Sequence, residues 1–208
     1  MSNKIIQITP KRKTREEILE LSVPLFAWYG YDGVSMRDIA AAVGLTSAAL
    51  YYHFPDKEHL YLDVVAHAFR EKSASTKEIL DGPGSPWERL ERFITDAARQ
   101  LASDQNFQRL MQWVILDSDE VRKHKLVEHV FSDVLVAVHS LAADLDSRQD
   151  AHMLAISIFG LVFFHYQIGI ARQFMPGHRP QQDNPDVLTR HVIGLLRNGL
   201  GGSDERTG

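Results

Sequence analysis

A short run of side chains in the first third of the chain is suited to contacting a nucleic-acid duplex. Residues Ser47–Ala49 are small, and small residues let a helix lie deep in the major groove. An alanine or a threonine methyl can also contact the methyl group of thymine. Residues Tyr51–His53 follow, and their polar tips can donate hydrogen bonds to phosphates. This chemistry is recognition by hydrogen bonding and apolar contact.

Lys57 adds a second indication of phosphate contact. Pro55 ends the preceding helix and Asp56 caps the next one, so Lys57 falls in a first helical turn. The helix dipole disfavours a cation there. A bound phosphate would remove the conflict, because it would pair with both the lysine and the free amides. The alternative is a solvated lysine, and beside Tyr51–His53 we favour the phosphate.

The elements that would position these residues are two short helices joined by a glycine turn. Ser35 and Asp38 have the spacing of a capping box, which starts the first helix. Gly44 ends that helix, because glycine adopts the left-handed conformation without a Cβ penalty. The second helix is expected over Ser47–His53, with Leu50 buried. This pattern predicts a helix-turn-helix.

The segment resembles the N-terminal domain of the TetR family of bacterial transcriptional regulators. The resemblance covers about a quarter of the chain, from Ile18 to His59. The matching blocks are Leu25-Phe26-Ala27, Gly30-Tyr31, Met36-Arg37-Asp38-Ile39-Ala40, Val43-Gly44-Leu45, Leu50-Tyr51-Tyr52-His53-Phe54 and Lys57-Glu58.

The resemblance implies roles for individual side chains. It implies base-edge contacts for Ser47, Ala48 and Ala49, and a guanine contact for Arg37. It implies phosphate contacts for Ser35, Thr46, Tyr51, Tyr52, His53 and Lys57. It also implies a dimer that binds double-stranded operator DNA, with two reading helices about one helical turn apart. A small-molecule effector in the C-terminal part would release the DNA, which makes the expected function that of a repressor.

The charge distribution also favours DNA contact. The chain has 208 residues and a net charge of −4. The first fifteen residues carry five cations and no acid, so the remainder carries about −9. We therefore expect residues 1–13, Lys13 included, to form a basic arm that binds phosphates. A disordered leader is the alternative.

Composition limits the other classes of function. The chain has no cysteine, which excludes disulfides and thiolate chemistry and fits a reducing cytoplasm. We see neither a signal peptide nor a confident membrane span. Phosphate-loop, nucleophile-elbow and zinc-protease motifs are missing, so we expect no enzyme, cofactor or metal site. The acidic cluster Asp117, Asp119 and Glu120 is interpreted as a solvated turn.

Helical periodicity continues along the chain and predicts an all-α protein. We expect a helix-turn-helix domain over 14–59 and a ligand-binding and dimerisation domain of bundled helices over 60–200. A long helix would join the two domains, and residues 201–208 would form a flexible tail. Helices are expected over Thr14–Tyr29, Asp56–Leu80, Ser85–Leu101, Phe107–Leu116, Leu126–Leu145, Asp150–Phe174 and Asp186–Leu200, with Asp117–Lys125 either a loop or a helix start.

Two of these helices are candidates for a dimer interface. The helix expected over Asp150–Phe174 is apolar on more than one face, which favours burial on all sides. Its second face would meet another subunit together with the last helix, although it could instead be the core of a monomer. The expected interface residues are Leu154, Ile158, Leu161, Val162, Val192, Leu195 and Leu196.

The C-terminal part also contains many aromatic and sulfur-bearing side chains. Such residues line apolar ligand sites, and they equally fill ordinary cores. The candidates for an effector pocket are Phe107, Met111, Trp113, Phe131, Met153, Phe163 and Gln167. The principal alternative to a DNA-binding regulator is a ligand-binding or interaction module that has kept this fold but no longer reads DNA.

Overall fold

The described part of the chain, residues 13–200 of a computed structural model, is built from helices, as the periodicity predicts; the side chains of Glu71, Ile170 and Leu200 are not included. The elements in chain order are α1 (Arg15–Tyr29), α2 (Met36–Ala42), α3 (Ser47–His53), α4 (Lys57–Leu80), α5 (Pro86–Ser103), α6 (Gln105–Leu116), α7 (Glu120–Leu126), η1 (Val127–Phe131), α8 (Ser132–Leu145), α9 (Ala151–Gln167), η2 (Gly169–Phe174), η3 (Pro180–Asp183) and α10 (Pro185–Leu200).

The helix starts are fixed by local capping, as the sequence predicts. Thr14, Ser35 and Ser85 each form a capping box, in which the hydroxyl accepts from the amide three residues on and a glutamate or aspartate there accepts in return. The side chains of Thr46 and Asp56 cap α3 and α4. These caps satisfy amides that have no partner inside their own helix.

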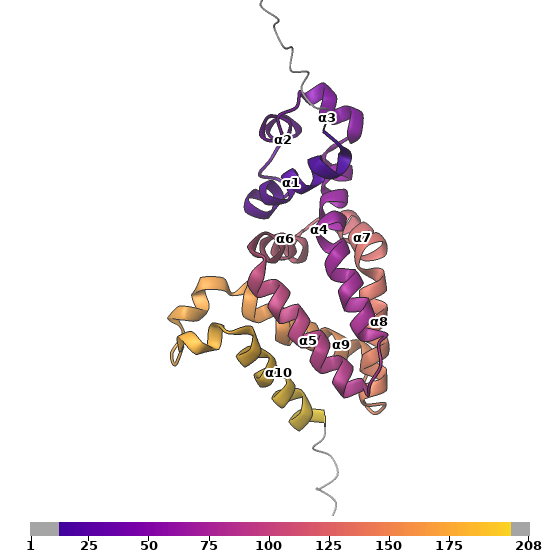
Figure 1. The fold of residues 1–208 in the computed structure, drawn as a ribbon, viewed down its shortest axis with the longest axis vertical. Coiled ribbons are helices and arrows are strands. Elements are labelled where there is room, and N and C mark those ends of the chain that lie inside the picture. Colours follow the sequence, from indigo (N-terminus) through magenta and orange to yellow (C-terminus); the bar gives the residue numbers. More distant parts are fainter. Residues whose placement is uncertain (1–12, 201–208) are drawn as a thin grey trace, which may run out of the picture.

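The N-terminal unit consists of α1, α2, α3 and the first turns of α4 (Figure 1). Its core includes Phe26, which meets Tyr61 of α4 edge to face at a ring-centroid distance of 5.1 Å. Val64 of α4 is also fully buried. Because these α4 residues belong to the N-terminal core, this packing unit extends beyond the boundary expected at residue 59.

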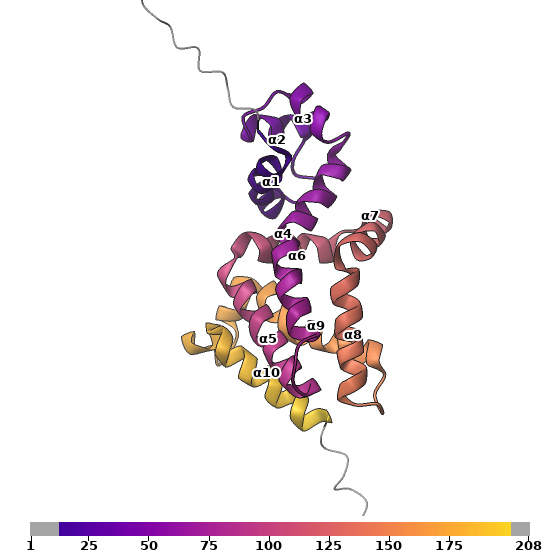
Figure 2. The same cartoon turned by 45° about the vertical axis from the view of Figure 1, so that its right-hand side comes forward.

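The C-terminal bundle consists of the rest of α4 and the helices from α5 to α10. Figures 1 and 2 show α6 crossing the molecule directly beneath α1, between the N-terminal unit and the remaining helices. Helix α4 runs from one unit into the other, and α5 packs against α4, α8, α9 and α10. Helices α8 and α9 also pack against each other. A change in the bundle can therefore reach the N-terminal unit through both α4 and α6.

Two features differ from the expectation, and one alternative that the sequence left open is decided. The apolar helix α9 ends at Gln167 and not at Phe174, because Gly169 has a φ of 50° and a 3₁₀ turn follows. The stretch Asp117–Lys125 contains most of the short helix α7. Between α7 and α8 lies a π-helical turn, Val127–Phe131, inside the stretch Leu126–Leu145 that we expected to be one helix, and Val127 is exposed there.

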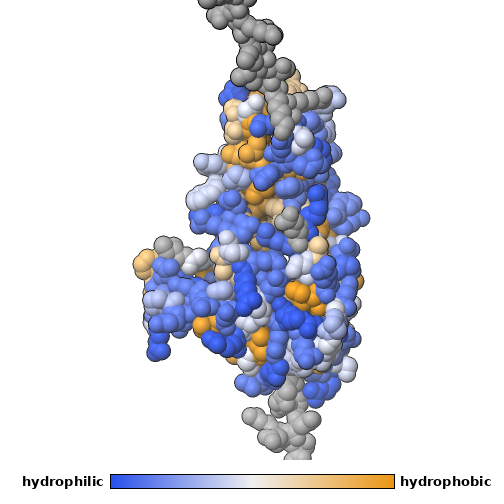
Figure 3. Space-filling model, in the orientation of Figure 1, coloured by the Kyte–Doolittle hydropathy of each residue, from blue (hydrophilic) through white to orange (hydrophobic). Residues whose placement is uncertain are grey.

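The face in Figure 3 is largely hydrophilic, with small hydrophobic patches over the N-terminal unit and the bundle. One continuous helical stretch, Glu120–Leu145, has the length and composition of a membrane span. In this fold its α8 part packs against α4, α5 and α9. Most of the predicted basic arm and the tail 201–208 lie outside the described residues.

Candidate nucleic-acid interface and ligand cavity

Helix α3 is attached to the N-terminal core by one side and leaves its other side accessible. Leu50 is the buried residue of this helix. Ala48 and Tyr51 are exposed, and Tyr52 is 75% exposed. Ser47, Ala49 and His53 are half-buried. A helix that enters a groove needs this arrangement, because its outward side chains must reach base edges and phosphates.

The two aliphatic hydroxyls proposed for phosphate contact, those of Ser35 and Thr46, differ in what they can still donate. The Ser35 hydroxyl donates to Asp38 Oδ2 at 2.5 Å, and the Ser35 amide donates to the same oxygen. These two hydrogen bonds lower the pKa of Asp38. A hydroxyl has one proton, so Ser35 must leave Asp38 before it can donate to a phosphate. Among residues 13–200, the Thr46 hydroxyl makes one hydrogen bond, which it accepts from the Ala49 amide at 3.2 Å. Thr46 therefore keeps its proton for a phosphate.

Lys57 is held by its own domain, which corrects the reason we gave for a phosphate at this position. Its ammonium donates to the carbonyl oxygens of Tyr31 at 2.9 Å and Val34 at 3.2 Å. It also lies 4.1 Å from the centre of the Tyr31 ring. The conflict with the helix dipole is thus relieved by two carbonyls and an aromatic face, and Lys57 serves to fix the α1–α2 loop.

Two further cations proposed for DNA contact lie on the same unit. Arg37 is exposed on α2. Lys13 is half-buried, and its Cε lies 3.9 Å from where a Cβ on Gly44 would stand, beside the turn between α2 and α3. The start of α1 therefore runs next to the helix-turn-helix.

Helix α6 joins the N-terminal unit to the bundle through a tryptophan. The Trp113 indole N–H donates to the carbonyl of Ala27 in α1 at 3.1 Å. The same ring lies against Gly30, where an added Cβ would come within 2.9 Å of it. Arg109 of α6 lies 3.7 Å from the centre of the Trp28 ring. These contacts pack α6 closely against the end of α1.

A buried ion pair in the bundle holds Arg122, whose guanidinium also contacts the Tyr31 ring of the N-terminal unit. Arg122 of α7 is buried and donates to both carboxylate oxygens of Asp117, at 2.5 and 2.7 Å. Burial raises the pKa of Asp117, but hydrogen bonds from Arg122 and the Asp119 amide outweigh it and hold the pKa below its usual range. Asp117 is therefore part of a structural ion pair, and our interpretation of this acidic cluster as a solvated turn is wrong for that residue.

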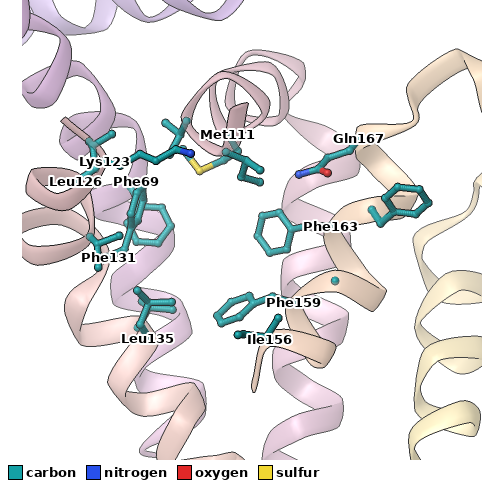
Figure 4. Close-up of a pocket in the computed structure, with 16 residues that line it drawn as sticks. Phe69, Met111, Lys123, Leu126, Phe131, Leu135, Ile156, Phe159, Phe163 and Gln167 are labelled. Carbon is teal, nitrogen blue, oxygen red and sulfur yellow. The ribbon is translucent and has the colours of Figure 1, made fainter. Parts of the chain in front are cut away.

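The bundle contains an apolar cavity of about 530 Å³ between α4, α6, α7, α8 and α9 (Figure 4). Its volume is in the range of ligand sites. One side is open to solvent, since several lining residues are exposed, Ile156 and Phe164 among them. The lining residues are Phe69, Met111, Val114, Ile115, Lys123, Leu126, Val127, Phe131, Val134, Leu135, Ile156, Phe159, Gly160, Phe163, Phe164 and Gln167.

Four of the seven residues predicted for the pocket line this cavity: Met111, Phe131, Phe163 and Gln167. The other three lie elsewhere. Phe107 is a core residue whose ring stacks on Phe69, Trp113 packs against α1, and Met153 is 61% exposed. The sequence carried no local signal for Phe69, Lys123, Leu135 or Ile156, because they come from four different elements that meet only in the folded bundle.

The end of α9, beside the cavity, is attached to α6 by two glutamines. Gln108 donates to the Tyr166 carbonyl at 2.7 Å. Gln112 donates to the carbonyls of Tyr166 at 3.3 Å and Gln167 at 3.2 Å. These carbonyls lie in the last turn of α9, where they lack partners in their own helix. Helix α6 therefore contacts the cavity, the end of α9 and α1.

The expected dimer residues are mostly core residues of the single chain. Leu154, Ile158, Val162, Val192 and Leu196 are buried within it, Leu161 is half-buried, and Leu195 is 48% exposed. A helix that is apolar all round does not reveal which face points inward, and the chosen face points toward α5 and α10. Three of the expected residues, Leu154, Leu195 and Leu196, nevertheless line a groove between α9 and α10, together with Gln149, Asp150, Met153, Ser157 and Gly199.

The N-terminal fold and its exposed helix define a protein of the helix-turn-helix class. Residues 18–64 match the family model described as bacterial regulatory proteins, tetR family. The N-terminal part of the chain is therefore similar to the domain that this family model describes. The chain is also 35% identical over 77 residues to the HTH-type transcriptional repressor KstR2 of Mycobacterium tuberculosis. That match covers 37% of this chain and 38% of the repressor.

Solved structures resemble the chain over nearly its whole length. The regulator FadR from Bacillus subtilis, solved in complex with stearoyl-CoA, aligns with a TM-score of 0.75 at 18% identity, covering 89% of this chain and 99% of that one. AibR, solved in complex with isovaleryl coenzyme A and operator DNA, aligns with a TM-score of 0.68 at 20% identity, covering 88% and 97%. At this identity the likeness shows the shared fold.

Proposed function

We propose that the protein is a cytoplasmic transcriptional regulator that inserts α3 into the major groove of operator DNA. The observation that carries the proposal is the exposed side of α3, which presents Ala48, Tyr51 and Tyr52 while Leu50 holds the helix on the core. Two similar proteins support the proposal. KstR2 is named as a transcriptional repressor, and AibR was solved in complex with operator DNA. Repression is the expected outcome of binding.

The test is a selection from random DNA followed by mobility-shift titration of the enriched sequence. Ala48→Asp places a carboxylate on the groove-facing side of α3, where it would meet phosphates and acceptor groups of the bases. We expect at least a tenfold loss of affinity. Ala102→Asp makes the same change at an exposed position of α5 and should bind like the unaltered protein. A selection that enriches no sequence would favour a module that no longer reads DNA.

We further propose that an apolar small molecule in the cavity controls DNA binding. The cavity lies between α8 and α9, and two of its walls, α6 and α7, also contact the N-terminal unit. FadR and AibR, which share this fold, were solved in complex with coenzyme A thioesters, and this supports the binding of a small molecule. A ligand can change DNA affinity only if it binds the DNA-competent and released states differently.

The operator is proposed to be read by a homodimer. The groove between α9 and α10 exposes Met153 and Leu195, apolar side chains that a second copy could cover. Leu195→Glu should yield monomers in light scattering, because it would bury a charge in the interface. Val136→Glu, at an exposed position of α8 outside this groove, should leave the dimer intact. A dimer that persists in Leu195→Glu would place the interface elsewhere.

A further inference from the structure

The cavity is polar at one end. Of its sixteen lining residues, Lys123 of α7 and Gln167 of α9 are the two with polar side chains. Figure 4 shows both at the end next to Met111 and α6, with the Gln167 amide directed inward. Leu135 and Ile156 lie toward the opposite end, and the rings of Phe159 and Phe163 lie between. The cavity therefore matches a ligand with one polar end and one apolar end.

The two polar groups have unused hydrogen-bonding capacity. The neighbouring cations on α7 are paired, Arg122 with Asp117 and Lys125 with Glu58. Within residues 13–200, the ammonium of Lys123 makes no hydrogen bond or ion pair, and the side-chain amide of Gln167 makes no hydrogen bond. Asp117, the nearby acid whose pKa Lys123 helps to lower, already accepts hydrogen bonds from two guanidinium nitrogens of Arg122. Lys123 and Gln167 can thus bind an incoming anion.

We propose that the cavity binds a fatty acyl ligand, with the oxygen atoms of its head group between Lys123 and Gln167 and its chain along Phe163 and Phe159 toward Leu135. The proposal rests on the ligand control proposed above and assigns its chemical class. An ammonium and an amide N–H both donate to a carbonyl or carboxylate oxygen. An apolar chain would cover the exposed aromatic and aliphatic wall, each buried methylene adding about 0.8 kcal/mol, or roughly fourfold in affinity.

The free carboxylate and the coenzyme A thioester are two sources of this chemistry. Calorimetric titration of the full chain with dodecanoate, dodecanoyl-CoA and dodecanol separates them. We expect dodecanol to bind at least tenfold more weakly than the tighter of the other two, because it has no anionic group for Lys123. Tighter binding of dodecanoate identifies the free acid as the ligand, and tighter binding of dodecanoyl-CoA identifies the thioester. Octanoyl, decanoyl and dodecanoyl members of the tighter series should gain about fifteenfold per two carbons.

Two variants test the head-group contacts. Lys123→Gln should weaken binding of the anionic probe about tenfold and leave dodecanol unchanged, and Gln167→Glu should repel the anion in the same way. Lys77→Gln removes one charge from an exposed lysine of α4 outside the cavity and should change neither probe. Equal binding of dodecanoate and dodecanol, unaffected by Lys123→Gln, would overturn the head-group assignment and leave an apolar ligand possible.

DNA binding by the ligand-free protein is measured separately, so failure of the ligand assignment remains distinct from failure of DNA recognition. A protein that binds DNA but none of the three probes would overturn the fatty acyl assignment. If Phe164→Glu also converted that protein to monomers, the open side of the cavity would be an interface with a second copy.

Discussion

The guanidinium carbon of Arg122 lies 3.8 Å from the centre of the Tyr31 ring. Arg122 belongs to the cavity-lining part of the bundle, and Tyr31 belongs to the α1–α2 loop of the N-terminal unit. The ammonium of Lys57, the first residue of α4, lies 4.1 Å from the same ring centre. Tyr31 is thus contacted by one cation from each unit. Such contacts contribute about 0.5–2 kcal/mol each. The loop is thus fixed by modest interactions, and the buried ion pair with Asp117 holds Arg122 in position for one of them.

Arg122→Ala should destabilise the protein by about 3 kcal/mol, because it leaves the buried Asp117 carboxylate without its partner. Urea unfolding monitored by circular dichroism measures the change. Arg190→Ala, at an exposed arginine of α10, should change the free energy of unfolding by less than about 0.5 kcal/mol. The double variant Arg122→Met with Asp117→Leu should recover most of the free energy of unfolding that Arg122→Ala loses. If the double variant recovered none of it, packing of Arg122 against Tyr31 would be the dominant contribution.

The same ion pair predicts acid sensitivity. Arg122 and the Asp119 amide hold the pKa of Asp117 below its usual range despite burial. A carboxyl with a lowered folded-state pKa contributes stability above its unfolded pKa of about 4, and the contribution is lost as the pH falls through the folded value. Stability should therefore decline below about pH 4. In Asp117→Asn this part of the decline should be missing, and an unchanged pH profile would contradict the assignment.

Gly30→Ala should separate α6 from α1. Gly30 has a φ of 68°, and an added Cβ would lie 2.9 Å from the Trp113 ring. Both the backbone conformation and the contact oppose a side chain, so we expect a loss of roughly 1–3 kcal/mol. Gly194→Ala is the control, because nothing lies within 4 Å of its Cβ position in α10 and alanine favours helix. Thermal unfolding of the two variants should shift in opposite directions.

The glutamines of α6 should transmit ligand binding to the N-terminal unit. Gln108 and Gln112 hold the last carbonyls of α9, while Trp113 of the same helix bonds α1. Replacing both glutamines with leucine should reduce the factor by which ligand changes DNA affinity to near one. The measurement is a DNA titration with and without saturating ligand. Gln105→Leu, at an exposed position of α6, should keep the full factor; an unaltered factor in the double variant would exclude this route.

Sequence reasoning succeeded where the determinants are local. The caps at Thr14, Ser35 and Thr46 depend on residues three positions apart, so the sequence alone could place α1, α2 and α3. The end of α9 was missed because Gly169 lies inside the apolar stretch that predicts a helix over Asp150–Phe174. Its positive φ makes it a helix breaker.

Reasoning from sequence failed where the answer depends on how helices are oriented in the bundle. The periodicity of α9 could not distinguish Ile158, which is buried, from Met153, which is exposed. Lys123 had no neighbour in the sequence to suggest a role, because Gln167 and the phenylalanines of α9 come from more than thirty positions away. Asp117 and Arg122 are five residues apart, and this spacing does not by itself indicate an ion pair, because neighbours on a helix surface are three or four residues apart.

The fluorescence of Trp113 can report movement of the N-terminal unit relative to the bundle. Its indole ring is bonded to Ala27 and pressed against Gly30, so any tilt of one half of the molecule against the other must change the surroundings of that ring. The chain has two other tryptophans, Trp28 and Trp87. With both replaced by phenylalanine, the emission of the remaining indole would follow the movement in real time, without a dye and without DNA.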